Sequence, residues 1–203
     1  MTPTSAQDDL AFMRSLVDTT GNFQRSFGEA YTAAGLCYGV QMLLHAAQGI
    51  GWIADAPMMG LVIGLAPTVV FLVLLAWIIR RNRGESRGGV VSRAVGAIFG
   101  ATGLANLVLI CVIGSVAWRE QSLTIWLIYP CTVLVLQGMA WLVMYALRRR
   151  SWFAVVGLGW FVTAIGMALT VTTPLAFIAI GGAGFLAFML VPGVVMMRQA
   201  RAA

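Results

Sequence analysis

Polar side chains inside long apolar stretches are the residues of this sequence that are best placed to bind a ligand. One set recurs at spacings of seven, three, four and three residues, which places its members on one face of a helix: Tyr31, Tyr38, Gln41, His45 and Gln48. Asn106 and Gln137 lie near the middle of two later apolar stretches. Because a polar group is costly to expose to hydrocarbon, we expect this face to turn toward other helices. The candidate ligand-binding residues are therefore Tyr38, Gln41, His45, Gln48, Asn106 and Gln137.

Two interpretations of these residues are open at this point. Amide and hydroxyl groups often join membrane helices through hydrogen bonds, which contribute about 0.6 kcal/mol each. The other interpretation is a ligand pocket or a polar pathway across the membrane. A metal or haem site is not expected, because His45 is the only histidine and a second ligand would have to come from another copy of the chain.

Signatures of catalysis are missing from the sequence. There is no HExxH motif, no glycine-rich phosphate loop and no Asp or Glu deep in an apolar stretch. Cys37, Cys111 and Cys131 all lie in apolar stretches, without a CxxC pair. We therefore expect no catalytic residue, no cofactor and no metal ion, and a protein that is not an enzyme. Transport coupled to protons or sodium is also disfavoured, since it usually requires an intramembrane carboxylate.

The composition indicates an integral membrane protein. Of the 203 residues, 60% are hydrophobic and 10% are charged, whereas soluble domains have about 25% charged residues. Apolar stretches of about twenty residues recur, which is the length that a helix needs to cross a bilayer. The stretches are continuous and do not alternate with polar residues, so they favour helices over a barrel.

The predicted fold is all-α, an integral membrane bundle of six transmembrane helices. A short amphipathic cytoplasmic helix over residues 8–18 precedes the bundle, with Leu10, Met13, Leu16 and Val17 on one face, and should end at residues 19–22. The domain boundaries expected are a cytoplasmic segment 1–28, a transmembrane domain 29–198 and a tail 199–203. The spans are predicted over residues 30–53, 57–79, 90–118, 123–147, 151–171 and 174–197.

The arginines predict the orientation of these helices. They gather in alternate connections and in the tail, as Arg80, Arg81, Arg83 and Arg87, then Arg148, Arg149 and Arg150, then Arg198 and Arg201. Charged residues of the other connections are only Asp55, Arg119 and Glu120. Because arginine-rich connections stay inside, both termini should be cytoplasmic, in a bacterial inner membrane and without a cleaved signal peptide. The same rule accounts for the net charge of +6, so no nucleic-acid partner is expected.

Small residues predict close helix packing. Glycines lie four residues apart at three places, namely Gly35 and Gly39, Gly60 and Gly64, and Gly96 and Gly100. Such pairs let helix backbones approach in lipid, either inside one bundle or in a homodimer. Gly181, Gly182 and Gly184, with Pro192 further on, should kink or loosen the last helix.

The N-terminal region resembles a group of small uncharacterised bacterial inner-membrane proteins. The likeness rests on the sequence Asp-Leu-Ala-Phe-Met-Arg-Ser-Leu of residues 9–16, a short polar break and a glycine-rich first span, over about forty residues. It implies a cytoplasmic segment followed by about six helices, and no activity.

Two functions are compatible with these observations. The first is a non-enzymatic membrane protein that binds a lipophilic or small ligand, or a protein partner, in a regulatory or structural role. The alternative is a small uncoupled transporter or channel that uses the polar residues near mid-membrane. The expected partners are the lipid bilayer and either another protein or a second copy of the chain.

Overall fold

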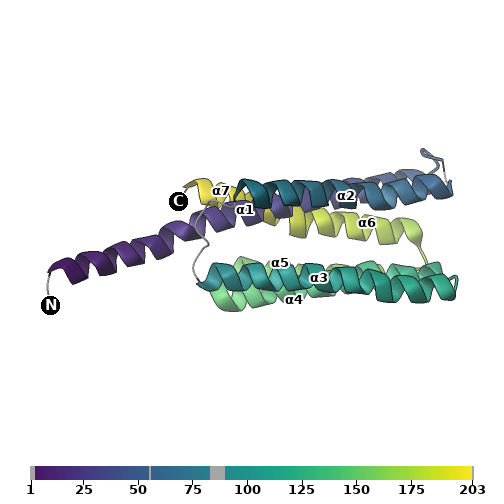
Figure 1. The fold of residues 1–203 in the computed structure, drawn as a ribbon. Coiled ribbons are helices and arrows are strands. Elements are labelled where there is room, and N and C mark those ends of the chain that lie inside the picture. The colour runs from purple at the N-terminus through teal and green to yellow at the C-terminus, as the bar shows by residue number, and fades with distance from the viewer. Residues whose placement is uncertain (1–2, 55, 83–89, 203) are drawn as a thin grey trace.

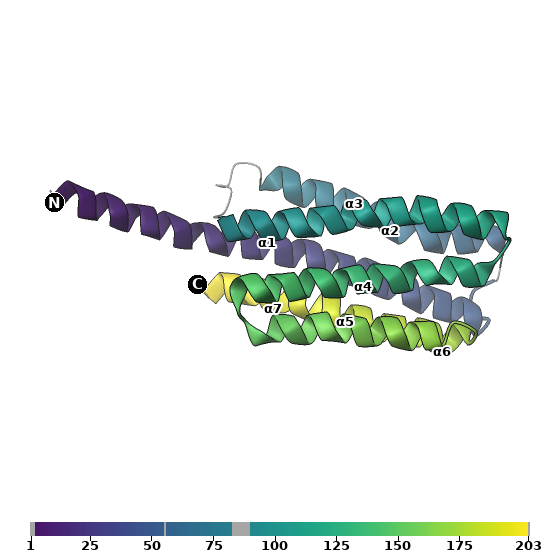
Figure 2. The same ribbon diagram turned by 90° about the horizontal axis from the view of Figure 1, so that it is seen from below.

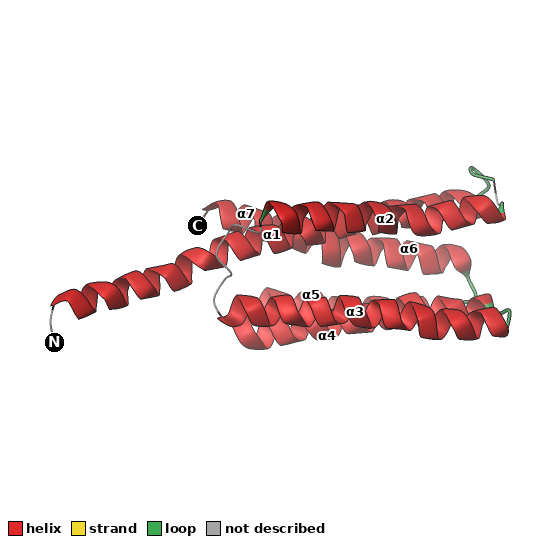
Figure 3. Cartoon of the chain, in the orientation of Figure 1, coloured by secondary structure: helices red, strands yellow, loops and turns green. Residues whose placement is uncertain are grey.

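The chain forms an antiparallel helical bundle. In the computed structural model residues 3–54, 56–82 and 90–202 are described, with side chains from Phe23 onward except at residues 57 and 90. No strand occurs in these ranges, as Figure 3 shows. The helices are α1 (Pro3–Gly49), α2 (Pro57–Arg81), α3 (Val90–Arg119), α4 (Leu123–Arg148), α5 (Ser151–Leu169), α6 (Pro174–Phe185) and α7 (Val191–Ala202), and a π-helical turn (Leu186–Leu190) joins the last two.

The helices lie in two layers. α1, α2, α6 and α7 form one layer, and α3, α4 and α5 form the other (Figures 1 and 2). Successive helices from α1 to α6 run in opposite directions and α7 continues in the direction of α6, so α2, α4 and α7 all end on the side where the C-terminus lies (Figure 1). We call this side the basic end, because Arg80 and Arg81, Arg148 to Arg150, and Arg198 and Arg201 are found there.

Among the described residues, five helical segments are long and apolar enough to cross a membrane. They are α2, α3, α4, α5 and the continuous segment from α6 to α7, which makes the chain a multi-pass membrane protein. The predicted ends of α2 to α5 are correct to within two residues. α1 is not in this set, but its second half packs against α2, α6 and α7 along the bundle (Figure 2).

The predicted end of the amphipathic helix is wrong, and the first and last spans, predicted to end at residues 53 and 197, end at Gly49 and Ala202. α1 is a single helix from Pro3 to Gly49, and it continues through residues 19–22, where we expected the amphipathic helix to end. Thr, Gly and Asn cost a helix about 1 kcal/mol or less each, whereas only proline stops it outright, and the sequence has no proline between Pro3 and Pro57. The N-terminal part of α1 therefore extends beyond the bundle (Figure 1). The predicted apolar face of residues 8–18 lies outside the described side chains.

The expected irregularity of the last helix is a π-helical turn. The backbone N–H of Val191 donates to the carbonyl of Leu186, five residues back. Pro192 has no N–H to donate to Phe188 in an α-helical pattern, so a wider turn accommodates the missing hydrogen bond. This turn packs directly on α1, because Gly35 lies against the backbone of Leu190.

The α1–α7 crossing is the place where glycine is required most strictly. A Cβ atom added at Gly193 would lie 2.6 Å from the backbone nitrogen of Thr32, and one added at Gly28 would lie 2.9 Å from the carbonyl oxygen of Gly193. Gly35 and Gly39 also face this layer, so the packing predicted for that pair is internal. In contrast, a Cβ atom at Gly60, Gly64 or Gly100 would meet no described atom within 4 Å, so these glycines lie on open faces.

The crossing predicts a sharp difference between two glycine substitutions. Gly193→Ala should destabilise the bundle by about 1–3 kcal/mol, because the backbone of Thr32 cannot move away as a flexible side chain could. Gly60→Ala, which adds the same methyl group on an open face, should leave stability within about 0.5 kcal/mol of the original. Thermal unfolding in the same detergent measures both, and equal unfolding temperatures for the two variants would contradict the crossing.

Candidate functional site

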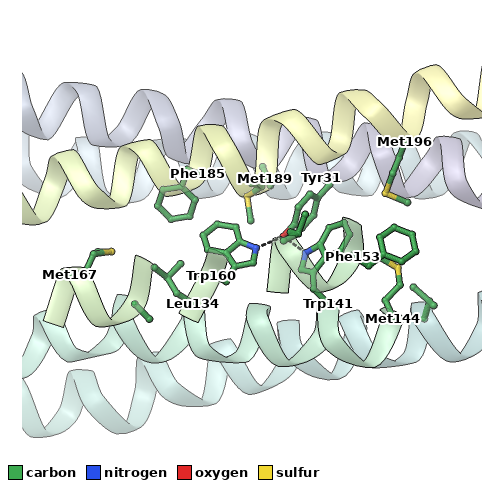
Figure 4. Packing of buried hydrophobic residues seen from close by; sticks show 14 of the residues in the cluster. Tyr31, Leu134, Trp141, Met144, Phe153, Trp160, Met167, Phe185, Met189 and Met196 are labelled. Carbon is green, nitrogen blue, oxygen red and sulfur yellow. Dashed lines mark hydrogen bonds between the residues drawn. The ribbon is translucent and has the colours of Figure 1, made fainter. Parts of the chain in front are cut away.

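The hydroxyl of Tyr31 on α1 is a polar group buried between the two layers. It accepts hydrogen bonds from the indole nitrogens of Trp141 on α4 (2.6 Å) and Trp160 on α5 (3.1 Å). It donates to the side-chain oxygen of Gln137, also on α4 (3.4 Å). Figure 4 shows the two indole rings pointing at the hydroxyl from the other layer. We call these four residues the Tyr31 hub.

The hydroxyl of Tyr31 has no hydrogen-bonding capacity left for a ligand. Trp141 and Trp160 are 0% exposed and Tyr31 is 6% exposed. The hydroxyl has one proton and two lone pairs, and all three are used. Phe27 and Phe99 cover the hub from the basic end, with Phe27 stacked on Tyr31 at 5.6 Å and edge-on to Phe99 at 4.6 Å. The hub is therefore a structural connection between the two layers.

The predicted site residues do not form one cluster. Gln41 donates to the backbone carbonyl of Gly64 on α2 (3.3 Å), and His45 is hydrogen-bonded to Gln48 on the same helix (3.2 Å). The amide oxygen of Asn106 on α3 accepts from the hydroxyl of Tyr129 on α4 (2.7 Å).

The two remaining predicted residues also lie apart from each other. Gln137 belongs to the Tyr31 hub, while the ring of Tyr38 packs between Phe71 on α2 (5.8 Å) and Phe185 on α6 (5.7 Å). The polar groups of the predicted set thus occur as separate pairs, most of which join two helices. This arrangement matches the interhelical hydrogen-bonding interpretation better than a shared pocket.

Trp141 and Trp160 were missed as polar residues by the sequence reasoning, although a signal for them exists. Tryptophan in membrane proteins usually lies near helix ends, at the level of the headgroups. Trp160 lies in the middle of α5, and Trp141 lies seven residues before the end of α4. An indole N–H buried that far inside requires an acceptor, and Tyr31 supplies it for both.

A groove between α1, α2 and α7 is the candidate ligand site. Its volume is about 280 Å³, and its wall is almost entirely apolar, formed mainly by Ala33, Leu36 and Cys37 of α1 and by Leu74 and Ile78 of α2. Met197 of α7 completes the wall. Because the wall is apolar, the groove is suited to hydrocarbon.

The mouth of the groove, at the basic end, carries charge. Glu29 of α1 forms ion pairs with Arg81 of α2 and with Arg25 one turn earlier on α1 (3.2 Å). The Arg81 guanidinium also lies over the ring of Trp77, 4.6 Å from its centroid. The groove thus has an apolar wall and a polar, partly cationic rim. This combination is complementary to an amphiphilic ligand.

Metal-binding chemistry finds no support in the described residues. Within residues 3–54, 56–82 and 90–202, no group of three His, Cys, Asp or Glu side chains lies close enough to hold a metal ion. Cys37, Cys111 and Cys131 are free thiols. Cys37 lines the groove, where its small apolar side chain contributes to the wall.

Comparisons with known proteins find no match. No family model, no curated protein and no solved structure matches this chain.

The hub predicts a large effect from the loss of one oxygen atom. Tyr31→Phe should destabilise the bundle by about 1–3 kcal/mol, because two buried indole N–H groups lose their acceptor. The control is Tyr145→Phe on α4, since the hydroxyl of Tyr145 makes no hydrogen bond to the described residues, and it should change stability by less than about 0.5 kcal/mol. Reversible unfolding in mixed micelles measures the difference, and equal losses would show that the hub contributes nothing specific.

Proposed function

We propose that this chain is a non-enzymatic integral membrane protein that binds a lipophilic ligand in the groove between α1, α2 and α7. The observation that carries the proposal is the apolar groove with the Glu29–Arg81 ion pair at its mouth. A hydrocarbon chain or flat ring would lie along Ala33 and Leu36, and a polar head would meet the ion pair. Such a ligand would bind in a regulatory or structural role.

The size of the groove limits the ligand. Pockets for whole drug-sized molecules have about 300–1,000 Å³, so a groove of about 280 Å³ accepts one chain or one small ring system. Its lining comes from α1, α2 and Met197 of α7, and this apolar lining would suit a lipophilic molecule of the bilayer. This geometry favours a membrane-derived amphiphile over a water-soluble solute.

The membrane topology is part of the proposal. The second half of α1 packs along α2, α6 and α7, which supports a sixth span beside the five apolar ones. With six spans and the arginines gathered at one end, both termini lie on the cytoplasmic side of a bacterial inner membrane. The extension of α1 then stands in the cytoplasm, where a protein partner could reach it.

An uncoupled transporter or channel has less support. The amides near mid-membrane are paired, as Gln41 is with Gly64 and Asn106 is with Tyr129. The centre between the layers is filled by the indole rings of Trp141 and Trp160. A polar pathway would need both the pairs and the hub to open.

The proposal predicts a bound molecule that depends on the groove. Native mass spectrometry of the protein released from native-lipid nanodiscs should show a reproducible adduct. Leu36→Trp, which narrows the groove, should reduce its occupancy about tenfold, because the chain loses its apolar contacts.

The matched control is Leu72→Trp on α2. Leu36 and Leu72 are both 51% exposed, but only Leu36 lines the groove. Leu72→Trp should leave the adduct unchanged. Absence of any adduct from the unmodified protein, or its equal loss in both variants, would reject the groove as the site.

A further inference from the structure

The turn between α4 and α5 holds three consecutive arginines that differ in their surroundings. Arg148 is half-buried: its guanidinium lies over the ring of Phe23 on α1 (5.9 Å to the centroid) and donates to the hydroxyl of Ser92 on α3 (3.4 Å). Arg150 donates to the side-chain oxygen of Gln199 on α7 (3.3 Å). Arg149 and Arg150 are both exposed, and the backbone of Arg149 caps α4 in a left-handed conformation with φ of 54°.

This turn has positive charge without a negative partner. Both ion pairs among the described residues belong to Glu29, and neither includes Arg148 or Arg150. The charge of Arg150 also acts on Arg148, so the two guanidinium groups repel each other. Their acceptors are neutral, a serine hydroxyl and a glutamine amide. A half-buried cation is costly unless an anion compensates it.

Two residues at this turn also have unsatisfied hydrogen-bond donors. The Nε atom of Arg148 and the indole nitrogen of Trp152 are both buried, and neither has a hydrogen-bond partner among the described residues. α5 begins at Ser151, with no side-chain cap and no acidic residue in its first turn, so its N-terminal N–H groups add further positive potential. Cations, donors and a helix N-terminus thus converge, with few acceptors to balance them.

We propose that this turn binds the phosphate group of an anionic phospholipid, with Arg148 and Arg150 as its two cationic contacts. Phosphate oxygens accept several charge-assisted hydrogen bonds at once, and arginine suits them geometrically. A lipid is the source that fits the position, since the turn ends one apolar span and begins the next, at the level of the headgroups. The aromatic rings of Phe23 and Trp152 would lie against the glycerol and the upper acyl chain.

This site is separate from the groove and does not depend on it. The groove uses Glu29 and Arg81 on α1 and α2, whereas the turn uses Arg148, the last residue of α4, and Arg150, which precedes α5. The site also differs from a general effect of loop charge. The orientation of the chain depends on all three arginines alike, but a phosphate site depends on Arg148 and Arg150 and not on Arg149.

The test is native mass spectrometry of the full chain in detergent with equal amounts of phosphatidylglycerol and phosphatidylcholine. The unmodified protein should retain phosphatidylglycerol preferentially. Arg148→Gln and Arg150→Gln should each reduce this preference about tenfold, which corresponds to the loss of one charge-assisted hydrogen bond. Arg149→Gln removes the same charge from the same turn and should keep the preference. Thermal unfolding in phosphatidylcholine alone shows which variants are folded, and Arg150→Gln decides the result if Arg148→Gln does not fold.

Addition of inorganic phosphate distinguishes a lipid headgroup from a free anion as the ligand of this turn. Millimolar phosphate, added to protein in phosphatidylcholine micelles, should not raise the unfolding temperature, whereas phosphatidylglycerol should. Stabilisation by phosphate that is lost in Arg150→Gln, without any preference for phosphatidylglycerol, would overturn the lipid assignment in favour of a soluble anion. Equal retention of both lipids without stabilisation by phosphate, or an equal effect of Arg149→Gln and Arg150→Gln, would overturn the site itself.

Discussion

The structure depends on one requirement, that a polar group buried between membrane helices must find its hydrogen-bond partner inside the protein. The hydroxyl of Tyr31 meets this requirement for two indole N–H groups at once, and so it ties α1 in one layer to α4 and α5 in the other. Around this connection aromatic rings fill the space between the layers (Figure 4), whereas α5 and α6 pack closely, with Thr163 against Gly184. The rest of the bundle is arranged around this connection.

Away from the hub, some helices pack closely and others leave part of their surface open. Glycines let α1 approach α7 closely at Gly193 and the π-helical turn at Gly35. α2 packs chiefly on α1, so a groove opens beside it. Both proposed lipid sites lie toward the basic end, where polar side chains can reach water and headgroups. The middle of the bundle serves stability, and the basic end is where we propose that recognition occurs.

Much of the fold could be predicted from the sequence, because apolar length and arginine position are local properties. The ends of α2 to α5 followed directly from them, and the loosened last helix followed from its glycines and Pro192. The continuation of α1 through residues 19–22 could not be predicted in this way, since weak helix breakers are overridden when no proline intervenes. The candidate site was harder still. Gln41, Asn106 and Gln137 share a similar predicted depth, but which helices face each other decides their partners, and helical spacing contains no such information.

Hydrogen exchange of the tryptophan side chains would show whether the Tyr31 hydroxyl holds the two buried indole groups. In a spectrum of ¹⁵N-labelled indole groups recorded in D₂O, the signals of Trp141 and Trp160 should be the slowest to exchange, because both rings are 0% exposed and hydrogen-bonded. Trp52 and Trp118, which are 83% and 77% exposed, should exchange first. Exchange of Trp141 and Trp160 as fast as that of Trp52 and Trp118 would contradict the hub and the two-layer bundle built on it.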